Sequence, residues 1–234
     1  MSYKKVSIVI PVYNERSTIE QVLDQVKAAP VLNLEKEIIL VDDFSNDGTR
    51  QFLEGLNDPS VRIFYQDQNY GKGFALHKGF EAATGDIAVI QDADLEYDPV
   101  EIEKMLRPIL ETGAKVVYGS RYLQPSQGLG FLHSFFNKLF TQVGNILIGQ
   151  KITDIMTCYK AFDREVLNKV IPSLESQRFG FEPEVTAKIS QAGYQIVEVP
   201  ISYQPRSKNE GKHMNFQGQV ESLLALIKYS LMVK

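Results

Sequence analysis

The chain has 234 residues, of which 44% are hydrophobic and 23% are charged. This composition is typical of a soluble globular protein, and the length is enough for one α/β domain with a substantial core. The formal net charge of −4 makes nucleic acid an unfavourable main partner, because phosphate backbones are bound by basic surfaces.

The chain has a single cysteine, Cys158, which excludes a disulfide within the chain and favours a reducing compartment. Free cysteine is most often simply buried, so we favour a packing role for Cys158 over a catalytic thiol. The first residues show no signal-peptide pattern, and no apolar run reaches the roughly 18 residues that suggest a membrane-spanning helix. We therefore expect a cytoplasmic protein whose contact with a membrane is peripheral.

The first 98 residues alternate between β-branched runs and segments with helical spacing of apolar residues. This alternation predicts an α/β fold with a mostly parallel central sheet that is flanked by helices on both faces. The predicted strands are 6–12, 37–41, 61–65 and 87–90, and the predicted helices are 17–29, 45–56 and a segment after residue 73 that ends at Ala83.

The pattern changes after Asp98, where longer helical segments alternate with two short strands and two polar loops. The helix at 131–148 has Phe and Leu on one side and polar residues on the other, so it could lie at a membrane interface or pack against the core. The predicted helices are 100–110, 131–148, 182–191 and 220–233, the strands are 115–118 and 195–201, and the loops are 124–130 and 202–217.

Polar residues follow three of the predicted strands at the point where each strand ends. They are the segments 11–15, 42–43 and 92–94. Ligands bind beyond the carboxyl ends of the strands in open α/β sheets, so we expect these segments to form one composite site.

Asp92-Ala93-Asp94 is the central feature of this expected site. Two carboxylates just beyond a buried strand favour Mg²⁺ or Mn²⁺, which take oxygen ligands and often share them with substrate phosphates. An isolated Asp-x-Asp could equally be an acidic turn, but its place beside two other strand ends favours the metal site.

Basic residues and glycines could complete an anion site. Gly71-Lys72-Gly73 lacks the Walker pattern, so it either brings a backbone and an ammonium group to phosphates or is a surface turn. Arginine suits bidentate phosphate contact, and a loop rich in cations could close over a bound nucleotide sugar. The candidate cations are Arg121, Arg206, Lys208 and Lys212.

Taken in order, six motifs resemble the family-2 glycosyltransferases of the GT-A fold, and within them the polyprenyl-phosphate sugar synthases. That subgroup includes dolichyl-phosphate mannose synthase, dolichyl-phosphate glucosyltransferase and bacterial relatives. The motifs are 11–15 (PVYNE), 41–49 (VDDFSNDGT), 69–73 (NYGKG), 92–94 (DAD), 119–122 (GSRY) and Arg206 with 210–212 (EGK), and the segments 154–160 and 181–184 also match.

The resemblance implies one glycosyltransferase domain over 1–234, with a nucleotide-binding half at 1–98 and an acceptor-binding half at 99–234 that includes a closing loop and the C-terminal helix. It implies a metal on Asp94, Asp92 and Glu96, and catalytic roles for Asp92, Asp94, Arg121 and Glu182. The donor-binding residues that it implies are Pro11, Tyr13, Glu15, Val41, Asp43, Lys72, Asp92, Ala93, Arg206 and Lys212.

The reaction that the resemblance implies is inverting transfer of a hexose from a nucleotide sugar to a polyprenyl phosphate at the inner face of a membrane, in cell wall biogenesis. Glu96 stands where the mannose synthases often carry Gln, and the 69–73 motif looks closer to the glucosyl branch, so we favour UDP-glucose over GDP-mannose as donor. The candidates for a general base, if one is used, are Asp154, Glu182 and Glu184.

Two main alternatives stay open from the sequence, with a nucleotidyltransferase as a third and weaker one. One is a glycosyltransferase with a soluble or cell-wall glycan as acceptor, and the other is a nucleotide-sugar-binding protein without turnover. A homo-oligomer is also left open.

Overall fold

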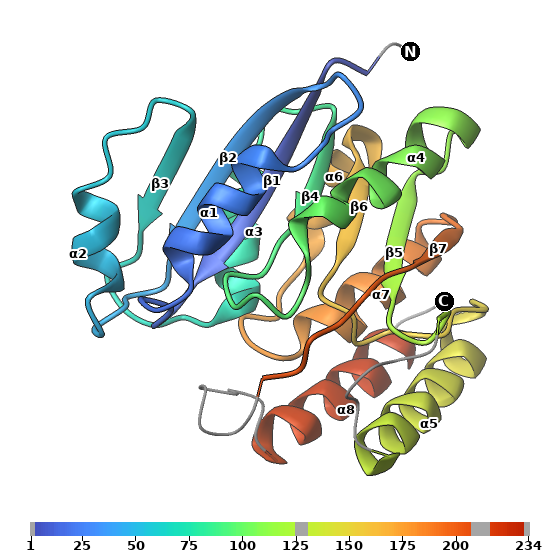
Figure 1. Cartoon of the computed structure of the whole chain (residues 1–234). Helices are drawn as coiled ribbons and strands as arrows, with labels where there is room; N and C mark the ends of the chain where they lie inside the picture. The colour runs from blue at the N-terminus through green and yellow to red at the C-terminus, as the bar shows by residue number, and fades with distance from the viewer. Residues whose placement is uncertain (1–2, 125–130, 207–215, 232–234) are drawn as a thin grey trace.

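A computed structural model of the chain describes residues 3–124, 131–206 and 216–231, and these form a seven-stranded sheet with helices on both faces (Figure 1). The strand order is β3-β2-β1-β4-β6-β5-β7. All neighbouring pairs are parallel except those of β6, which is antiparallel to β4 and to β5. The expected mostly parallel α/β sheet is confirmed. The strands are β1 (Lys5–Val12), β2 (Glu35–Asp42), β3 (Val61–Tyr65), β4 (Ile87–Ile90), β5 (Val116–Ser120), β6 (Lys160–Asp163) and β7 (Ile196–Pro200).

The two faces of the sheet are covered by different helices. Side chains alternate across a strand, so Ile8 and Ile10 of β1 pack with α1, α2 and α4, whereas Val9 packs with α3, α6 and α7. The helices are α1 (Ile19–Ala28), α2 (Thr49–Glu54), α3 (Lys72–Ala82), α4 (Ile102–Thr112), α5 (Phe131–Ile148), α6 (Arg164–Lys169), α7 (Phe181–Gln191) and α8 (Phe216–Leu231), with 3₁₀ turns η1 (Pro99–Glu101) and η2 (Ile171–Ser173).

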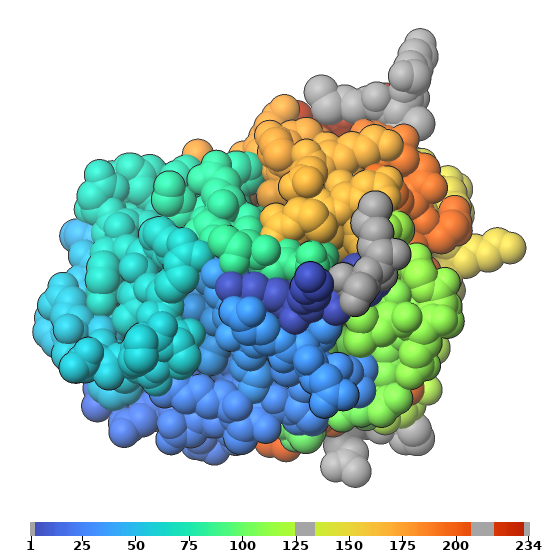
Figure 2. Space-filling model, turned by 90° about the horizontal axis from the view of Figure 1, so that it is seen from above, coloured from blue at the N-terminus to red at the C-terminus, as the bar shows by residue number. Residues whose placement is uncertain are grey.

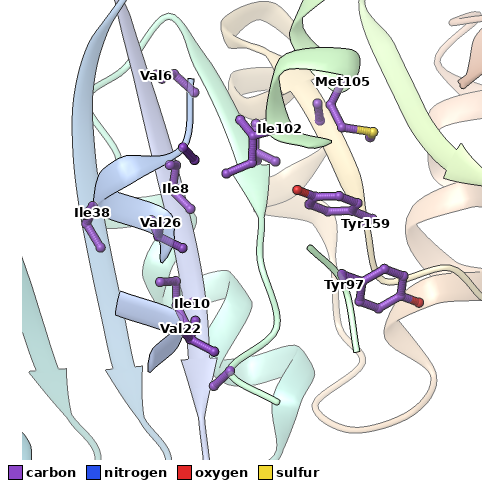
Figure 3. Close-up of a cluster of buried hydrophobic side chains, with 14 of the residues drawn as sticks. Val6, Ile8, Ile10, Val22, Val26, Ile38, Tyr97, Ile102, Met105 and Tyr159 are labelled. Carbon is purple, nitrogen blue, oxygen red and sulfur yellow. The ribbon is translucent and has the colours of Figure 1, made fainter. Parts of the chain in front are cut away.

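Figure 3 shows the core on the α1 and α4 face. Val22 and Val26 of α1 lie against β1, and Met105 of α4 lies beside Tyr97 and Tyr159. All five side chains are at most 2% exposed. Tyr97 belongs to the first half of the chain and Tyr159 to the second. Their ring centroids are 5.4 Å apart, so the core on this face is continuous between the two halves.

The carboxyl ends of β1, β2 and β4 lie at one edge of the sheet, opposite the N-terminus of the chain (Figure 1). Figure 2 looks onto the opposite end, around the N-terminus, where the blue-to-teal first half and the green-to-orange second half are in direct contact. The polar segments that follow the three strands therefore lie together at the edge away from the view of Figure 2.

The structure corrects several predicted boundaries. Helix 45–56 is reduced to α2, because Gly48 turns with a φ of 98° and Asp47 accepts hydrogen bonds from the backbone and hydroxyl of Thr49. β6 and α6 were not predicted. β6 is only four residues long and begins with Lys160, a charged residue that is 0% exposed, so its sequence carries no strand periodicity.

Both predicted loops in the second half lie partly outside the described residues, and α8 begins at Phe216 rather than at residue 220. α5 and α8 lie side by side at the edge of the sheet where the parallel strands end (Figure 1). Within the described residues, no helix combines the length and the apolar character that crossing a bilayer requires.

Candidate functional site

A cavity of about 400 Å³ opens at the carboxyl ends of the parallel strands. Its walls come from both halves of the chain, so it joins the strand ends to residues of α7 and of the segment after β7. The sequence-predicted residues that line it are Pro11, Tyr13, Glu15, Asp43, Lys72, Asp92, Ala93, Asp94, Glu96, Arg121, Glu182 and Arg206.

Each of the three strand exits turns through a residue other than glycine with positive φ. The residues are Asn14 after β1 (φ 55°), Phe44 after β2 (φ 67°) and Leu95 after β4 (φ 62°). This left-handed conformation costs energy for side chains with a Cβ, and such strain concentrates at functional sites. The three turns bend the chain abruptly, so the residues before each turn line the cavity.

Hydrogen bonds fasten the exits to one another. The backbone N–H of Asn14 donates to Ser45 Oγ at 2.9 Å, and that of Glu15 donates to Thr49 Oγ1 at 2.9 Å. Thr18 Oγ1 donates to the carbonyl of Ala93 at 2.8 Å. Ser45 and Thr49 therefore join β1 to β2, and Thr18 joins β1 to β4.

Asp43 organises the turn before α3. Its carboxylate accepts the backbone N–H groups of Tyr70 and Gly71, each at 2.8 Å. Burial raises the pKa of Asp43, although these two N–H groups act in the opposite direction. A Cβ at Gly71 would lie 2.8 Å from the carbonyl oxygen of Gln177, so this glycine is needed for close packing of segment 176–178 against the turn.

Lys72 supplies a cation to the inner end of the cavity. Its Nζ lies 2.6 Å from Asp92 Oδ1 and 4.0 Å from Glu182 Oε1. Burial lowers the pKa of Lys72, but the charge of Asp92 more than compensates and raises that pKa well above its ordinary value. Burial and the charge of Asp92 also raise the pKa of the neighbouring Cys158 thiol, which keeps it protonated and favours the packing role.

Asp94 lies among other carboxylates. Burial and the charges of Asp92 and Glu96 raise the pKa of Asp94 to about 7. The Arg206 guanidinium partly offsets this, since its NH2 atom lies 3.0 Å from Asp94 Oδ2. The same guanidinium reaches both oxygens of Glu15 at 2.9 Å.

Arg121 is held in place by a buried ion pair. Its Nε and NH2 atoms each lie 2.7 Å from one oxygen of Asp154, and the two side chains are 6% and 0% exposed. Asp154 also accepts from Asn137 at 3.0 Å, and its backbone N–H donates to Glu198 Oε1 at 3.1 Å. This fixed guanidinium can present its remaining N–H groups to an anion in the cavity.

The cavity thus combines paired carboxylates, four cationic side chains and apolar walls beyond the ends of parallel strands, which suits a ligand with both anionic and apolar parts. The family model described as glycosyl transferase family 2 matches residues 7–171. The chain belongs to this family. The match contains all three strand exits, and it confirms the family resemblance drawn from the motifs.

The names of two relatives of this glycosyltransferase contain a lipid phosphate, dolichol phosphate in one and undecaprenyl phosphate in the other. It is 31% identical over 213 residues to "Dolichol-phosphate mannosyltransferase" of Pyrococcus furiosus, a match that covers 89% of this chain but only 59% of the relative. It is 29% identical over 218 residues to "Undecaprenyl-phosphate mannosyltransferase" of Micrococcus luteus, which covers 89% of this chain and 87% of that relative.

Solved structures support the GT-A fold. Glucosyl-3-phosphoglycerate synthase from Mycobacterium tuberculosis, in complex with Mn²⁺, UDP and glucosyl-3-phosphoglycerate, superposes with a TM-score of 0.73. The identity is 20%, over 99% of this chain and 81% of the other. Mannosyl-3-phosphoglycerate synthase from Rubrobacter xylanophilus gives a TM-score of 0.72 at 19% identity, over 97% and 73% of the two chains.

The donor atoms of the glycosyltransferase fit a hard divalent cation. Asp92 and Asp94 contribute carboxylate oxygens at the end of a buried strand, and oxygen is the ligand that Mg²⁺ and Mn²⁺ take. Asp94 is buried close to the charges of Asp92 and Glu96, and of the neighbouring charges that of the Arg206 guanidinium is the one that acts to lower its pKa. Glu96 is less available, since one oxygen accepts from Tyr203 Oη and the other from the backbone of Arg206.

Some predicted residues do not face the cavity. Val41 is 0% exposed and packs with Ile39 and Ala75 in the core behind it. Glu184 turns toward the backbone N–H groups of Glu175 and Ser176, so it is poorly placed as a base. Lys208 and Lys212 lie outside the described residues.

The structure also adds residues that the sequence did not indicate. Tyr97, Met156, Arg178, Phe179 and Tyr203 line the cavity. Arg178 and Phe179 lie three and two residues before the motif at 181–184, and this proximity is the one signal in the sequence that points to them.

Proposed function

We propose that this glycosyltransferase moves a hexose from a nucleoside diphosphate sugar to a polyprenyl phosphate, with inversion at the anomeric carbon and with Mg²⁺ or Mn²⁺. The observation that carries the proposal is the meeting of Asp92 and Asp94 with Lys72, Arg121 and Arg206 in one cavity. The favoured donor is UDP-glucose rather than GDP-mannose, from the sequence at 69–73.

Donor binding is assigned to the strand exits. Pro11, Tyr13, Glu15 and Asp43 would hold the nucleoside, with Val41 acting only through packing behind them. Ala93, Arg206 and Lys212 would bind the diphosphate. Asp94 and Asp92 would hold the metal, which neutralises a diphosphate leaving group. Glu96 can join them only if it releases a contact to the segment after β7.

The acceptor phosphate is assigned to Arg121. A phosphate oxygen forms the new bond to the anomeric carbon while the bond from that carbon to the diphosphate breaks, and the nucleoside diphosphate leaves. The nucleophile is already an anion near neutral pH, so no strong base is needed. Glu182, which lines the cavity near Lys72, is the candidate if the acceptor is instead a hydroxyl group.

The lipid acceptor requires a surface that meets a membrane, and we assign it to α5 and α8. Each helix carries apolar side chains on the side opposite its buried face, and these chains are 40–82% exposed. Several such side chains provide reversible binding to an interface. They are Phe135, Phe136, Leu139, Val143 and Ile146 on α5, and Val220, Leu223, Leu224, Ile227 and Leu231 on α8. The proposed location is the inner face of a membrane.

The names of the archaeal and bacterial relatives support a lipid phosphate acceptor. The Mn²⁺ and UDP in the mycobacterial complex support a metal and a uridine donor. The α5 helix had two interpretations from the sequence, and its strongly exposed Phe136 favours the interface over the core.

A transfer assay tests the proposal. Purified protein is incubated with labelled UDP-glucose or GDP-mannose, Mn²⁺ and undecaprenyl phosphate in vesicles, and lipid-linked sugar is measured. We expect more lipid product with UDP-glucose than with GDP-mannose, and a fall of about 100-fold or more in Asp94→Asn. A parallel incubation supplies a soluble glycan in place of the vesicles. Label found only on that glycan would favour the first alternative, and donor binding without transfer or hydrolysis in either incubation would favour a binding protein.

A further inference from the structure

Residues 202–206, here called the strap, contribute Tyr203 and Arg206 to the wall of the cavity and are held by Glu96. Tyr203 Oη donates to Glu96 Oε2 at 2.8 Å, and the backbone N–H of Arg206 donates to Glu96 Oε1 at 2.9 Å. The backbone N–H of Gln204 donates to the carbonyl of Glu96 at 3.0 Å. One acidic residue therefore fixes the strap at three points.

The strap carries the Arg206 guanidinium into the acidic end of the cavity. Its NH2 atom lies 3.0 Å from Asp94 Oδ2, and its two terminal nitrogens lie 2.9 Å from the two oxygens of Glu15. The other oxygen of Asp94 accepts the backbone N–H of Glu96 at 3.1 Å. Both oxygens of Asp94 are thus already engaged before any metal binds.

A metal ion and this guanidinium compete for the same oxygen. A bound Mg²⁺ lies about 2.0–2.1 Å from a carboxylate oxygen, so with Arg206 still 3.0 Å away the two cations would be at most about 5 Å apart. The side chains of Arg206 and Asp94 are each 14% exposed, so water screens this repulsion only weakly. Lys72 contacts Oδ1 of Asp92, the other proposed metal ligand, so Lys72 and Arg206 act on different carboxylates of the site.

We propose that Arg206 is a stand-in cation: it neutralises Asp94 and Glu15 while the donor site is empty, and it moves to the donor diphosphate when metal and nucleotide bind. The inference rests on the donor and metal of the proposed function. Because Glu96 holds the strap by its backbone, the exchange is a movement of the Arg206 side chain. As long as no nucleotide is bound, Arg206 therefore weakens the binding of a metal ion to Asp94.

Metal titrations without nucleotide are the first test. Mn²⁺ binding is followed by the electron paramagnetic resonance signal of the free ion for the wild type and for Arg206→Gln. Removal of the competitor should tighten Mn²⁺ binding roughly tenfold. The matched control is Arg178→Gln, which removes the same charge from the same cavity but whose NH2 atom contacts the carbonyl of Asn69.

The control separates direct competition from the general field of the cavity. The proposal would be overturned if Mn²⁺ affinity rose equally in Arg178→Gln and Arg206→Gln, or if it did not rise in Arg206→Gln. Arg206→Lys keeps the charge but lacks the forked geometry that reaches Glu15 and Asp94 together. Its Mn²⁺ affinity should therefore lie between those of the wild type and Arg206→Gln. Circular dichroism confirms that each variant is folded.

The second test repeats the titrations with saturating UDP or GDP. The higher Mn²⁺ affinity of Arg206→Gln should disappear or reverse. In the wild type Arg206 then contacts the phosphates of the nucleotide and stabilises the complex of protein, metal and nucleotide. A gain that persists unchanged with bound nucleotide would mean that Arg206 never leaves Asp94, and would overturn the exchange. If neither nucleotide binds, the proposed function fails, whereas the metal titration alone still decides whether Arg206 competes.

Movement of the strap can be monitored independently. The chain has no tryptophan, so Gln204→Trp introduces a single tryptophan at an exposed strap position, and its emission can be excited selectively over that of tyrosine. The backbone contacts to Glu96 should persist in the exchange. Addition of Mn²⁺ and nucleotide should therefore change the emission of the tryptophan at position 204 only slightly. A large change that also occurs in the Arg206→Gln background would show that the whole strap moves and would contradict a side-chain exchange.

Discussion

Nζ of Lys72 lies 2.6 Å from Oδ1 of Asp92, which joins the turn before α3 to the acidic strand exit after β4. The two residues are 20 positions apart, and their motifs were recognised separately in the sequence. The pair neutralises Asp92, whereas Arg206 contacts Asp94. It also leaves the lysine close to Glu182, where a sugar or its diphosphate would lie.

Replacement of Lys72 tests this pair. In Lys72→Met the carboxylate of Asp92 loses its partner and repels the donor diphosphate, so we expect kcat/KM to fall by at least about 100-fold. Lys78→Met is the matched control, because Lys78 is on the same helix with its side chain 50% exposed. Equal activity of the two variants in the transfer assay would show that Lys72 is only a surface cation.

Asp94→Asn tests the metal site. The substitution removes one charge without a change of shape, so the melting temperature should stay close to that of the wild type. Transfer should fall by about 100-fold or more, because several kcal/mol of charge stabilisation depend on the metal. Near-normal turnover that still requires metal would place the metal on other residues.

Asp43→Ala tests the nucleoside site. Loss of the carboxylate frees the N–H groups of Tyr70 and Gly71 and loosens a wall of the cavity. Calorimetry should show UDP and GDP bound about tenfold more weakly, with or without metal. Asp67→Ala, at an exposed position just before the same turn, is the control. Unaltered affinity in Asp43→Ala would reduce Asp43 to a structural role.

Glu37 provides a test of stability against pH. Although burial acts to raise its pKa, hydrogen bonds from Ser7, Thr84 and Arg62 lower it from 4.5 to about 2. A carboxylate with a lowered folded-state pKa stabilises the fold above its unfolded-state pKa, and this contribution is lost as the pH falls from about 4.5 toward 2. Glu37→Gln should therefore reduce the free energy of unfolding at pH 7 by about 2–3 kcal/mol.

The difference between wild type and Glu37→Gln should shrink as the pH falls below 4.5, as measured by urea denaturation. Glu35→Gln on the same strand is the control, because the side chain of Glu35 is 70% exposed. A difference that stays constant down to about pH 3 would mean that packing, and not charge, accounts for the effect.

The double substitution Phe135→Asp/Phe136→Asp tests the membrane surface. Both side chains are more than half exposed, so the protein should remain folded. Sedimentation with anionic liposomes and transfer to lipid acceptor should be lost, whereas nucleotide binding should be retained. Gln21→Asp/Gln51→Asp, at exposed positions of α1 and α2, controls for the two added charges. A folded double variant that still glycosylates lipid in vesicles would leave α8 as the membrane contact.

The sequence by itself determined the class of fold, the family and most of the cavity wall. Strand runs, helical periodicity and polar strand exits are local signals, and parallel strands bring their carboxyl ends together whatever the details of packing. Asp43, Asp92 and Asp94 could therefore be identified before any contact was known.

Only the tertiary structure decided how the charges are paired. Which cation neutralises Asp92 or Asp94, and which acidic residue fixes Arg206 or Arg121, depends on contacts between residues 20 to 191 positions apart. The antiparallel β6 was likewise decided by its neighbours, because a four-residue segment that begins with a fully buried lysine has no periodicity of its own. Long-range pairing has no local signature, since its free energy arises only when distant segments share one desolvated site.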